Sequence, residues 1–390
     1  MIYDFDKVYT KREPGNCKWD VEKGCIALSV ADMDFASPPE VTEALINRVS
    51  TGLYGYEMMT ERDYQAIIDW RFKRHGEVIK REHLMATPGV LNTMRAALYA
   101  LTNEGDKVIV MPPLHTPSIT SASMRGRVCV EVLMNDDGNG YYTLNYEGIE
   151  QAFKDGAKVL MFCSPSNPSG RVWTKEELER LAKIVIKYNG YVIADEIHAD
   201  IVYKGHKFIS LRLIEGMEDR SVCVFSPSKS FNFGGFHIGS VVVKDDNLRN
   251  KIKDILYETG NVCGRPTAMS ICAQTAAYTK GGAWLDQLLE YLQGNIDFVC
   301  KELEGTPLKA YKPESTILMW IDCSALKLTT EKYNELMKKA GVMPDPGHYY
   351  WMDNHKIDAY KGLQDHIRIN IGAPRATLKE ALDRLKSVLL

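Results

Sequence analysis

The sequence predicts an α/β fold in which a mostly parallel sheet forms a large domain and a smaller α+β unit completes the chain. Short runs of β-branched and apolar residues alternate with longer amphipathic stretches, which is the pattern of repeated strand and helix units. Several of these runs end in polar or Gly-rich turns. The 390 residues, 45% hydrophobic and 25% charged, fit a globular chain of two or three domains.

The alternating elements occupy the first part of the chain. A helix is expected over 91–101, after a Pro-Gly turn. A second helix is expected over 175–187, because Thr174 precedes it and Glu177 follows three residues later, which is a capping box. Strands are expected at 107–111, 128–133, 158–163, 191–194, 222–225 and 240–243.

The pattern changes after about residue 285, where a long amphipathic helix is followed by strand-like runs at 316–322 and 366–371. This predicts a separate α+β unit. The sequence contains no internal repeat, low-complexity tract or flexible linker, so the two parts are expected to share an interface.

Charge and cysteine content narrow the class of protein. A net charge of −3 without long charged runs gives no footprint for nucleic acid or an anionic membrane, which favours a small-molecule partner. The nine cysteines form no C-x-x-C pair, and Cys163 and Cys223 lie in apolar strand segments. They indicate reduced thiols and a cytoplasmic protein. The N-terminus lacks a signal-peptide core, and no apolar run approaches the roughly 18 residues of a membrane span.

Lys229 is the first candidate for chemistry. It follows the strand at 222–225 and stands between serines, including Ser226, and the Gly234-Gly235 turn. Hydroxyl and backbone donors around an amine suit a ligand that carries both a phosphate and an aldehyde, and a lysine can form a Schiff base with a carbonyl. A solvated surface lysine is the commoner interpretation of a lysine alone. Pyridoxal phosphate fits the surroundings of this one.

Asp195 ends another apolar strand, with Glu196 and His198 close behind it. Open α/β sheets bind ligands at the carboxyl ends of their strands. Pyridoxal chemistry needs an anion beside the pyridine nitrogen, and Asp195 is the candidate. The alternative is a Mg²⁺-binding acidic pair, but no phosphate loop of the G-x-x-x-x-G-K-[ST] kind accompanies it.

Asn167 follows the strand at 158–163, in a loop where Asn-Pro and Ser-Gly indicate a turn. Its amide would face the same strand-end crevice and could donate to the phenolate oxygen of a pyridoxal ring. An Asx-type turn without a ligand is the alternative.

In this order, with each residue after a separate strand, Asn167, Asp195 and Lys229 give the chain a resemblance to fold-type I pyridoxal-phosphate enzymes of the class I/II aminotransferase superfamily. The resemblance covers essentially the whole chain. It implies an aspartate-aminotransferase-like large domain over 45–285 and a small domain formed by 1–44 and 286–390. Four segments resemble the cystathionine β-lyase, or C–S lyase, branch: 18–20 (Lys-Trp-Asp), 30–35 (Val-Ala-Asp-Met-Asp-Phe), 195–200 (Asp-Glu-Ile-His-Ala-Asp) and 228–232 (Ser-Lys-Ser-Phe-Asn).

The cofactor phosphate needs backbone donors, and Gly89 and Val90 lead directly into the helix expected over 91–101. A helix N-terminus binds anions, although Pro-Gly alone is also a plain helix start. Ser226 would complete this phosphate cup. The superfamily often has an arginine eight residues after the lysine, but this chain has His237 there, so hydroxyls and amides are expected to carry more of the phosphate charge.

The resemblance assigns roles to four further residues. His198 would donate to the phenolate oxygen, with a core histidine as the alternative. His115 stands where the branch usually places an aromatic residue, commonly tyrosine, stacked on the ring. Arg368 would bind the substrate α-carboxylate together with Asn167, with an interdomain salt bridge as the alternative. Tyr56, or Tyr54 two residues earlier, would reach the cofactor phosphate of a neighbouring subunit, which implies a homodimer with shared active sites.

These residues imply a pyridoxal-phosphate C–S β-lyase, in which Lys229 removes the α-proton and a thiolate leaves from the β-carbon. Cystathionine, cysteine and other cysteine S-conjugates remain open as substrates, and 341–351 is expected to rim the entrance. An aminotransferase would use the same residues. A regulatory pyridoxal-binding protein is a third alternative, which the joint presence of a base, a ring anion and a carboxylate clamp argues against. A dinucleotide-binding dehydrogenase is disfavoured because no G-x-G-x-x-G follows an early strand.

Overall fold

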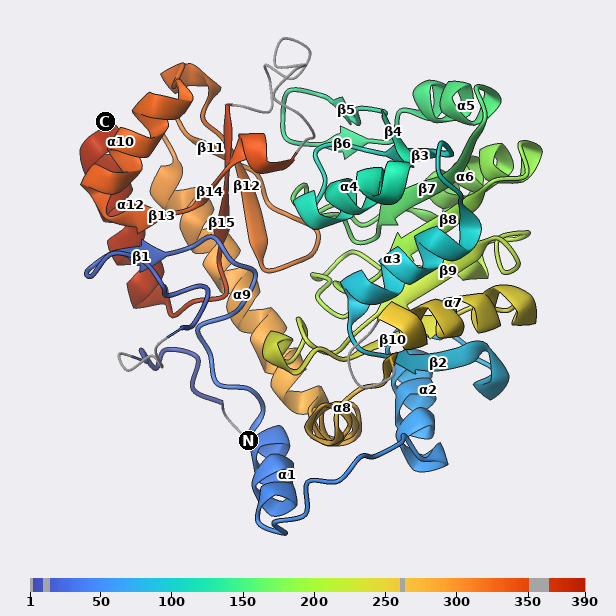
Figure 1. Cartoon of the computed structure of the whole chain (residues 1–390). Helices are drawn as coiled ribbons and strands as arrows, with labels where there is room; N and C mark the ends of the chain where they lie inside the picture. Colours follow the sequence, from blue (N-terminus) through green and yellow to red (C-terminus); the bar gives the residue numbers. More distant parts are fainter. Residues whose placement is uncertain (1–2, 10–14, 260–263, 351–364, 390) are drawn as a thin grey trace.

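A computed structural model describes residues 3–9, 15–259, 264–350 and 365–389. Its large sheet has seven strands, and Figure 1 shows it beside a second, smaller sheet. The strands run in the spatial order β2 (Leu84–Thr87), β10 (Gly239–Val242), β9 (Ser221–Phe225), β8 (Tyr191–Asp195), β7 (Ala157–Cys163), β3 (Lys107–Val110) and β4 (Val128–Glu131). From β9 to β4 all neighbours are parallel, and β10 is antiparallel to both β2 and β9.

The elements expected from the sequence are present. All six predicted strands form, each within about two residues of its predicted ends, and the prediction of a mostly parallel sheet is confirmed. The helices at 91–101 and 175–187 are α3 (Val90–Leu101) and α6 (Lys175–Lys187). The predicted capping box is also confirmed, because the Glu177 N–H donates to Thr174 Oγ1 (3.2 Å) and the Thr174 N–H donates to Glu177 Oε2 (2.8 Å). Strand β2 was not predicted.

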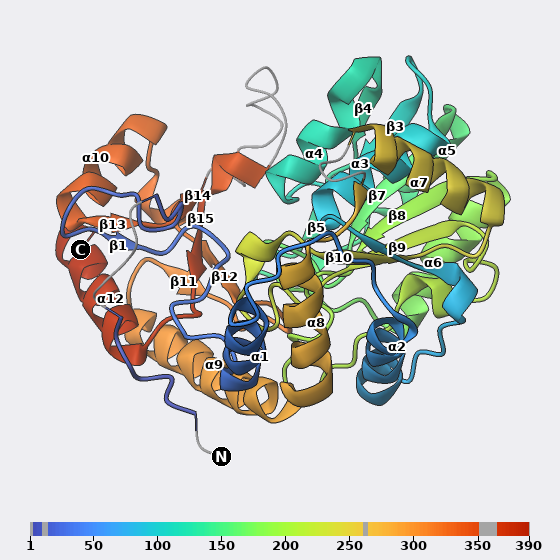
Figure 2. The ribbon, with the colours of Figure 1, turned by 60° about the horizontal axis from the view of Figure 1, so that its bottom comes forward.

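Helices cover both faces of the large sheet (Figure 1). On one face, α3, α4 (Thr116–Ser123) and α7 (Asp246–Thr259) bury an apolar cluster that includes Met94, Ile119 and Ile252. On the other face, α5 (Tyr146–Lys154) and α6 bury Ile149 and Leu181 with neighbouring strand residues. A further group contains α1 (Pro39–Val49), which packs on α8 (Ala268–Lys280), and α2 (Glu61–His75), which also packs on α8 (Figure 2).

The small sheet is antiparallel, in the order β11 (Lys309–Ala310), β12 (Leu318–Asp322), β15 (His366–Asn370) and β14 (Asp345–Pro346). The N-terminal segment joins it, because β1 (Ile26–Ala27) pairs with β13 (Val342–Met343).

The predicted domain boundaries at 44/45 and 285/286 fall inside α1 and α9 (Gly282–Leu303), and the division stays a prediction. The remaining elements are the pair β5 (Asn135–Asp136) and β6 (Tyr142–Thr143), α10 (Thr330–Ala340), α12 (Arg375–Leu389), and short 3₁₀ helices at Arg81–His83, Met124–Gly126, Leu211–Leu213, Gly234–Phe236, Ser324–Leu326 and Gly347–Tyr350.

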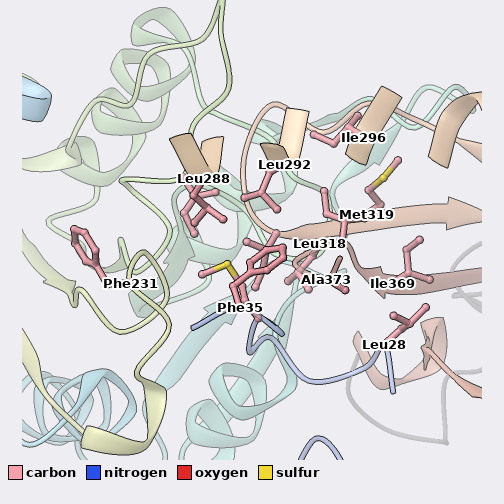
Figure 3. Close-up of a cluster of buried hydrophobic side chains, with 14 of the residues drawn as sticks. Leu28, Phe35, Phe231, Leu288, Leu292, Ile296, Leu318, Met319, Ile369 and Ala373 are labelled. Atoms are coloured by element: carbon pink, nitrogen blue, oxygen red, sulfur yellow. The ribbon is translucent and has the colours of Figure 1, made fainter. Parts of the chain in front are cut away.

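One apolar cluster joins segments that are far apart in the sequence. Figure 3 shows side chains of α9, of the strands β12 and β15, and of the N-terminal segment converging on one another. Leu28 and Leu292 are fully buried in it, and Phe35 is 5% exposed. Phe231, two residues after Lys229, belongs to the same cluster and lies 6.2 Å from Trp284 between ring centroids. The turn that carries Lys229 is therefore packed against the start of α9.

Within the described ranges, no helix combines the length and the apolar character needed to cross a membrane.

Leu292→Ala should lower the free energy of unfolding by about 2–5 kcal/mol, because it removes a fully buried side chain from this cluster. Ile186→Ala on α6 is the matched control, since Ile186 is 40% exposed and its truncation should change stability by well under half as much. Urea denaturation of the two variants checks the difference. Equal losses would contradict the placement of Leu292 in the core.

Candidate active site

The three strand ends that carry the main candidate residues are neighbours in the large sheet. Cys163 at the end of β7 pairs with Asp195 at the end of β8, and Asp195 pairs with Val224 near the end of β9. Asn167 lies in the loop after β7, and Lys229 lies in the turn after β9. Because parallel strands end at one edge of the sheet, Asn167, Asp195 and Lys229 meet at that edge, as the sequence predicted.

The Lys229 amine is held by the N-terminal segment. Its Nζ donates to the Ala31 carbonyl (2.7 Å) and contacts Asp32 Oδ1 (3.2 Å). The lysine side chain is 21% exposed, so it is partly shielded and still accessible. The contact with Asp32 was not predicted from the sequence.

Asp195 and His198 are both buried and have opposite pKa shifts. Burial raises the pKa of Asp195 from its ordinary value of 3.8 to about 6. The hydrogen bond from the Ile197 N–H and the positive charge of Lys229 both act to lower this pKa, but burial outweighs them. Burial, with the positive charges of Lys229 and Arg368, lowers the pKa of His198 to about 3. Its Nδ1 has no hydrogen-bond partner within the described part of the chain. Because buried polar groups are normally hydrogen-bonded, this Nδ1 is available to a bound ligand.

Glu196 does not share a site with Asp195. Its carboxylate binds Arg71 (2.6 Å) and the Ser210 hydroxyl (2.6 Å), and Arg71 also pairs with the buried Glu77. The acidic-pair alternative therefore does not fit, because the Glu196 charge is already neutralised inside the protein. In the described ranges, no group of three His, Cys, Asp or Glu side chains could hold a metal ion.

His115 is the residue at the start of α4, at the position assigned to ring stacking. Its desolvation, with the positive charges of Arg368 and Lys229, lowers its pKa to about 3. His115 is consequently a neutral ring at physiological pH, and it lies within electrostatic range of both Lys229 and Arg368.

Arg368 connects the two sheets. From β15 its guanidinium donates to Asn167 Oδ1 (3.0 Å) and to the Ser29 carbonyl (2.7 Å), and it pairs with Asp345. The arginine is 4% exposed, and its Nε has no partner among the described residues. Of the predicted entrance segment 341–351, Trp351 lies outside the described residues. The contribution of Asp345, which stands between two prolines, was not predicted.

The proposed phosphate cup forms where α3 begins. Gly89 is the N-cap of α3 with φ 107°, a value that glycine adopts readily, and no side chain caps the helix there. The free N–H groups of the first turn, including that of Val90, are available to an anion. A methyl group on Gly239 would come within 3.2 Å of the Val90 nitrogen, so β10 passes close behind the turn.

Ser226 and His237 border the same turn. The Ser226 hydroxyl donates to the Ile238 carbonyl (2.6 Å) and accepts from the Ser228 N–H (3.1 Å). His237 is exposed and left-handed (φ 50°), and its backbone would lie 3.8 Å from a Cβ added to Gly89. The fold therefore brings Ser226 and His237 beside Gly89.

Tyr56 is the one candidate that the fold of a single chain leaves apart. It is 94% exposed and lines a surface hollow of about 950 Å³, together with Tyr54, Arg265 and Met269 but none of the other candidate residues. The Tyr54 hydroxyl donates to the Val49 carbonyl of its own chain (3.1 Å).

All four branch-like segments meet around the Lys229 turn, where the Ser230 hydroxyl donates to Asp200 (3.2 Å). Lys18 pairs with Asp34 (3.0 Å), and the Trp19 indole donates to the same carboxylate (2.9 Å). Asn232, three residues after Lys229, accepts from the Met33 N–H (2.8 Å) and donates to the carbonyls of Met33 (2.9 Å) and Phe35 (2.6 Å). These segments therefore belong to one hydrogen-bonded joint, which sequence comparison alone does not indicate.

The donor set fits pyridoxal phosphate. The uncapped N-terminus of α3 matches a phosphate, the free Nδ1 of His198 and the Asn167 amide match a ring oxygen, and buried Asp195 matches a protonated ring nitrogen. Lys229 lies in the turn after β9, and β9 is the strand between β8, which carries Asp195, and β10, which borders the phosphate cup.

Comparison with known proteins agrees with this geometry. The family described as aminotransferase class I and II matches residues 23–385. The cystathionine β-lyase PatB of Bacillus subtilis is 33% identical, with 99% of this chain and 100% of PatB covered. A PLP-bound putative aminotransferase from Clostridium difficile has a TM-score of 0.93 at 33% identity, with 100% of both chains covered. Cystalysin from Treponema denticola, which contains pyridoxal 5'-phosphate, has a TM-score of 0.93 at 30% identity, with 100% and 99% covered.

The resemblance and the fold class predicted from the sequence are thereby confirmed. The chain belongs to the class I and II aminotransferase family.

Proposed function

We propose that this protein is a pyridoxal-phosphate-dependent C–S β-lyase, which cleaves cystathionine or a related cysteine S-conjugate to a thiol, pyruvate and ammonia. The observation that carries the proposal is the meeting of Lys229, Asp195 and Asn167 on three adjacent strand ends, opposite Arg368. Full-length similarity to PatB, named a cystathionine β-lyase, and to cystalysin supports the choice of reaction.

Each part of the cofactor has residues that would hold it. Lys229 would bind its aldehyde carbon, and the buried Asp195 carboxylate would pair with its ring nitrogen. His198 and Asn167 would donate to the phenolate oxygen. Ser226 and the amides of Gly89 and Val90 would receive the phosphate, and neutral His115 would stack on the ring. When bound, the cofactor supplies an electron sink that makes the α-proton of an amino acid removable.

The substrate is positioned from the small sheet. Arg368 would bind the α-carboxylate with its guanidinium, assisted by Asn167, which it already contacts. The guanidinium of Arg368 would then be shared between Asp345 and the substrate carboxylate. The Nε of Arg368, which has no partner among the described residues, is a further donor for that carboxylate.

Lys229 is the base. Its Nζ takes the α-proton, the electron pair of that C–H bond forms a double bond between Cα and Cβ, and the C–S bond breaks with its pair on sulfur. Hydrolysis of the resulting enamine gives pyruvate and ammonia.

An aminotransferase is the second candidate. The putative aminotransferase from Clostridium difficile is as similar to this chain as PatB is in identity, and transamination would use the same side chains. A regulatory pyridoxal-binding protein is the third, and the intact set of base, ring anion and carboxylate clamp argues against it.

We also propose that the enzyme is a homodimer with active sites shared between subunits. The stretch 53–58 exposes Leu53 (72%), Tyr54 (66%), Tyr56 (94%) and Met58 (68%) to solvent in a single chain. Closely spaced exposed apolar side chains of this size are typical of an interface. A second copy covering this stretch would bring Tyr56 to the phosphate of the neighbouring site.

We place the enzyme in the cytoplasm, since Cys163 and Cys223 are buried thiols and are not paired.

The reaction should be tested with L-cystathionine and the purified holoenzyme, by following pyruvate and free thiol. We expect equal amounts of both without added 2-oxo acid. Lys229→Ala should reduce the rate by about 10²- to 10⁴-fold, because the base is lost, whereas exposed Lys204→Ala should not change it. Conversion of the cofactor to its pyridoxamine form, reversed by a 2-oxo acid and without thiol release, would instead establish an aminotransferase.

Asp195→Asn should stabilise the cofactor-free protein while impairing the enzyme. Because the pKa of Asp195 rises from 3.8 to about 6 on folding, the native state binds the proton more tightly, and stability falls as pH rises between these values. Above pH 6 the full cost is about 3 kcal/mol, and asparagine removes it. Turnover with cofactor should fall about 10- to 100-fold, because the charged partner of the ring nitrogen is lost.

Denaturation of the cofactor-free variant at pH 5 and pH 8 checks the first part of this prediction. The gain should be larger at pH 8, and exposed Asp254→Asn on α7 should show none. A loss of stability at pH 8 would contradict the buried, uncompensated state of Asp195.

Shared sites can be tested by mixing two inactive variants under conditions in which subunits exchange. A dimer of one Lys229→Ala and one Tyr56→Ala subunit contains one intact site, so the mixture should recover about a quarter of wild-type activity. Tyr54→Ala in place of Tyr56→Ala should be active by itself. Recovery with Tyr54→Ala but not with Tyr56→Ala would assign the role to Tyr54, and a monomer in light scattering would exclude the dimer.

A further inference from the structure

Asp32 is the one side-chain carboxylate that contacts the Lys229 amine in the described part of the chain. Lys229 Nζ lies 3.2 Å from Asp32 Oδ1 and 2.7 Å from the Ala31 carbonyl. Both acceptors come from the N-terminal segment, whereas Asp195 belongs to the large sheet. None of the roles derived above uses the Asp32 carboxylate.

The backbone of Asp32 is fixed by other residues. Its carbonyl accepts from Lys18 Nζ (2.8 Å) and from the Asn370 amide (2.7 Å), and the same amide also donates to the Val30 carbonyl (2.6 Å). Asn370 is fully buried, so these bonds are shielded from water. The side chain of Asp32 is therefore presented from a rigid backbone and is free to hold the amine.

The distance between Asp32 and Lys229 is fixed from the lysine side as well. Asn232 belongs to the turn of Lys229, and it holds the backbone of Met33, the residue after Asp32, through both its carbonyl and its amide. Space around the contact is limited, because a Cβ on Gly234 would lie 3.1 Å from Asp32 Oδ1 and 3.8 Å from Lys229 Nζ. The two groups are thus held together by the joint itself.

The carboxylate discriminates between the two states of the amine. A carboxylate binds an ammonium more strongly than a neutral amine, because the hydrogen bond is then charge-assisted. Asp32 is 44% exposed, so the difference is moderated by solvent. The state that Asp32 favours is the one that exists after Lys229 has taken the α-proton of the substrate.

Elimination and transamination differ in where that proton goes next. In elimination the proton stays on Nζ while the C–S bond breaks and the sulfur leaves with the electron pair, and the thiolate can take a proton from water. In transamination the same proton must pass from Nζ to the cofactor carbon that the lysine previously held. An ammonium anchored to Asp32 and the Ala31 carbonyl makes this second transfer less favourable.

We propose that Asp32 is a positioning residue that favours elimination over transamination by retaining the proton on Lys229. The proposal rests on the proposed C–S lyase function, and it adds the residue that determines the reaction outcome.

The first measurement concerns the amine alone. In the cofactor-free full chain, the rate at which acetic anhydride acylates Lys229 at fixed pH is followed by peptide mass spectrometry. Asp32→Asn should raise this rate about two- to fivefold, because the carboxylate that holds the amine is lost. Glu22→Gln is the matched control: it also removes a carboxylate from the N-terminal segment, is 73% exposed and should leave the rate unchanged.

The second measurement concerns the reaction outcome. Holoenzyme is incubated with L-cystathionine without a 2-oxo acid, and the ratio of pyruvate released to cofactor converted to the pyridoxamine form is determined. Asp32→Asn should lower this ratio by about two- to fivefold, and Glu22→Gln should not. Asp32→Ser serves as a second variant, and thermal melting of each variant verifies that it is folded.

The outcomes are separable. A change in both measurements supports the proposal. A change in acylation with an unchanged ratio leaves the contact in place but overturns its role in the reaction outcome, and an unchanged acylation rate overturns the proposal whatever the ratio does. If the wild-type enzyme converts its cofactor to the pyridoxamine form and releases no thiol, the lyase function is wrong, and so is the proposed preference for elimination. The acylation rates would still show whether Asp32 holds Lys229.

Discussion

The constraint on which this molecule depends is the partial burial of residues 28–35, whose backbone is hydrogen-bonded to side chains from both sheets. Their backbone polar groups cannot reach water freely, so side chains from distant parts of the chain satisfy them. Asn232 does this from the large sheet, and Asn370 and Arg368 do it from the small one. The same bonds set the position of Lys229 relative to Arg368. The proposed base, Lys229, and the proposed carboxylate clamp, Arg368, are consequently placed by one set of hydrogen bonds, although they belong to different sheets.

The charge distribution follows from this enclosure. His115 and His198 are held neutral because two cations, Lys229 and Arg368, lie nearby and water is excluded. Glu196, next to Asp195 in the sequence, is neutralised separately by Arg71. The Asp195 carboxylate, by contrast, remains available to a ligand, and its burial raises its pKa.

Local signals in the sequence were sufficient for much of the fold. The capping box at Thr174 identified the start of α6, and apolar runs identified six strands of the large sheet. Strand β2 was missed because its sequence, Leu-Met-Ala-Thr, contains no run of β-branched residues. The candidate residues that follow strands could be identified because strand ends meet at one edge. The contacts of Lys229 with Asp32 and of Arg368 with Asp345 could not, since they join residues 197 and 23 positions apart through the tertiary structure. Tyr56 lies apart from the other candidate residues in the single chain, and the proposed homodimer would account for this position.

The uncapped start of α3 has a consequence for the amount of folded enzyme. No side chain caps the first N–H groups of this helix, which packs on the large sheet, so a phosphate bound there as proposed would act as its cap. Any ligand that binds only the native state raises its stability in proportion to the logarithm of the ligand concentration. A cofactor bound in this way would therefore contribute to the folding equilibrium of the chain.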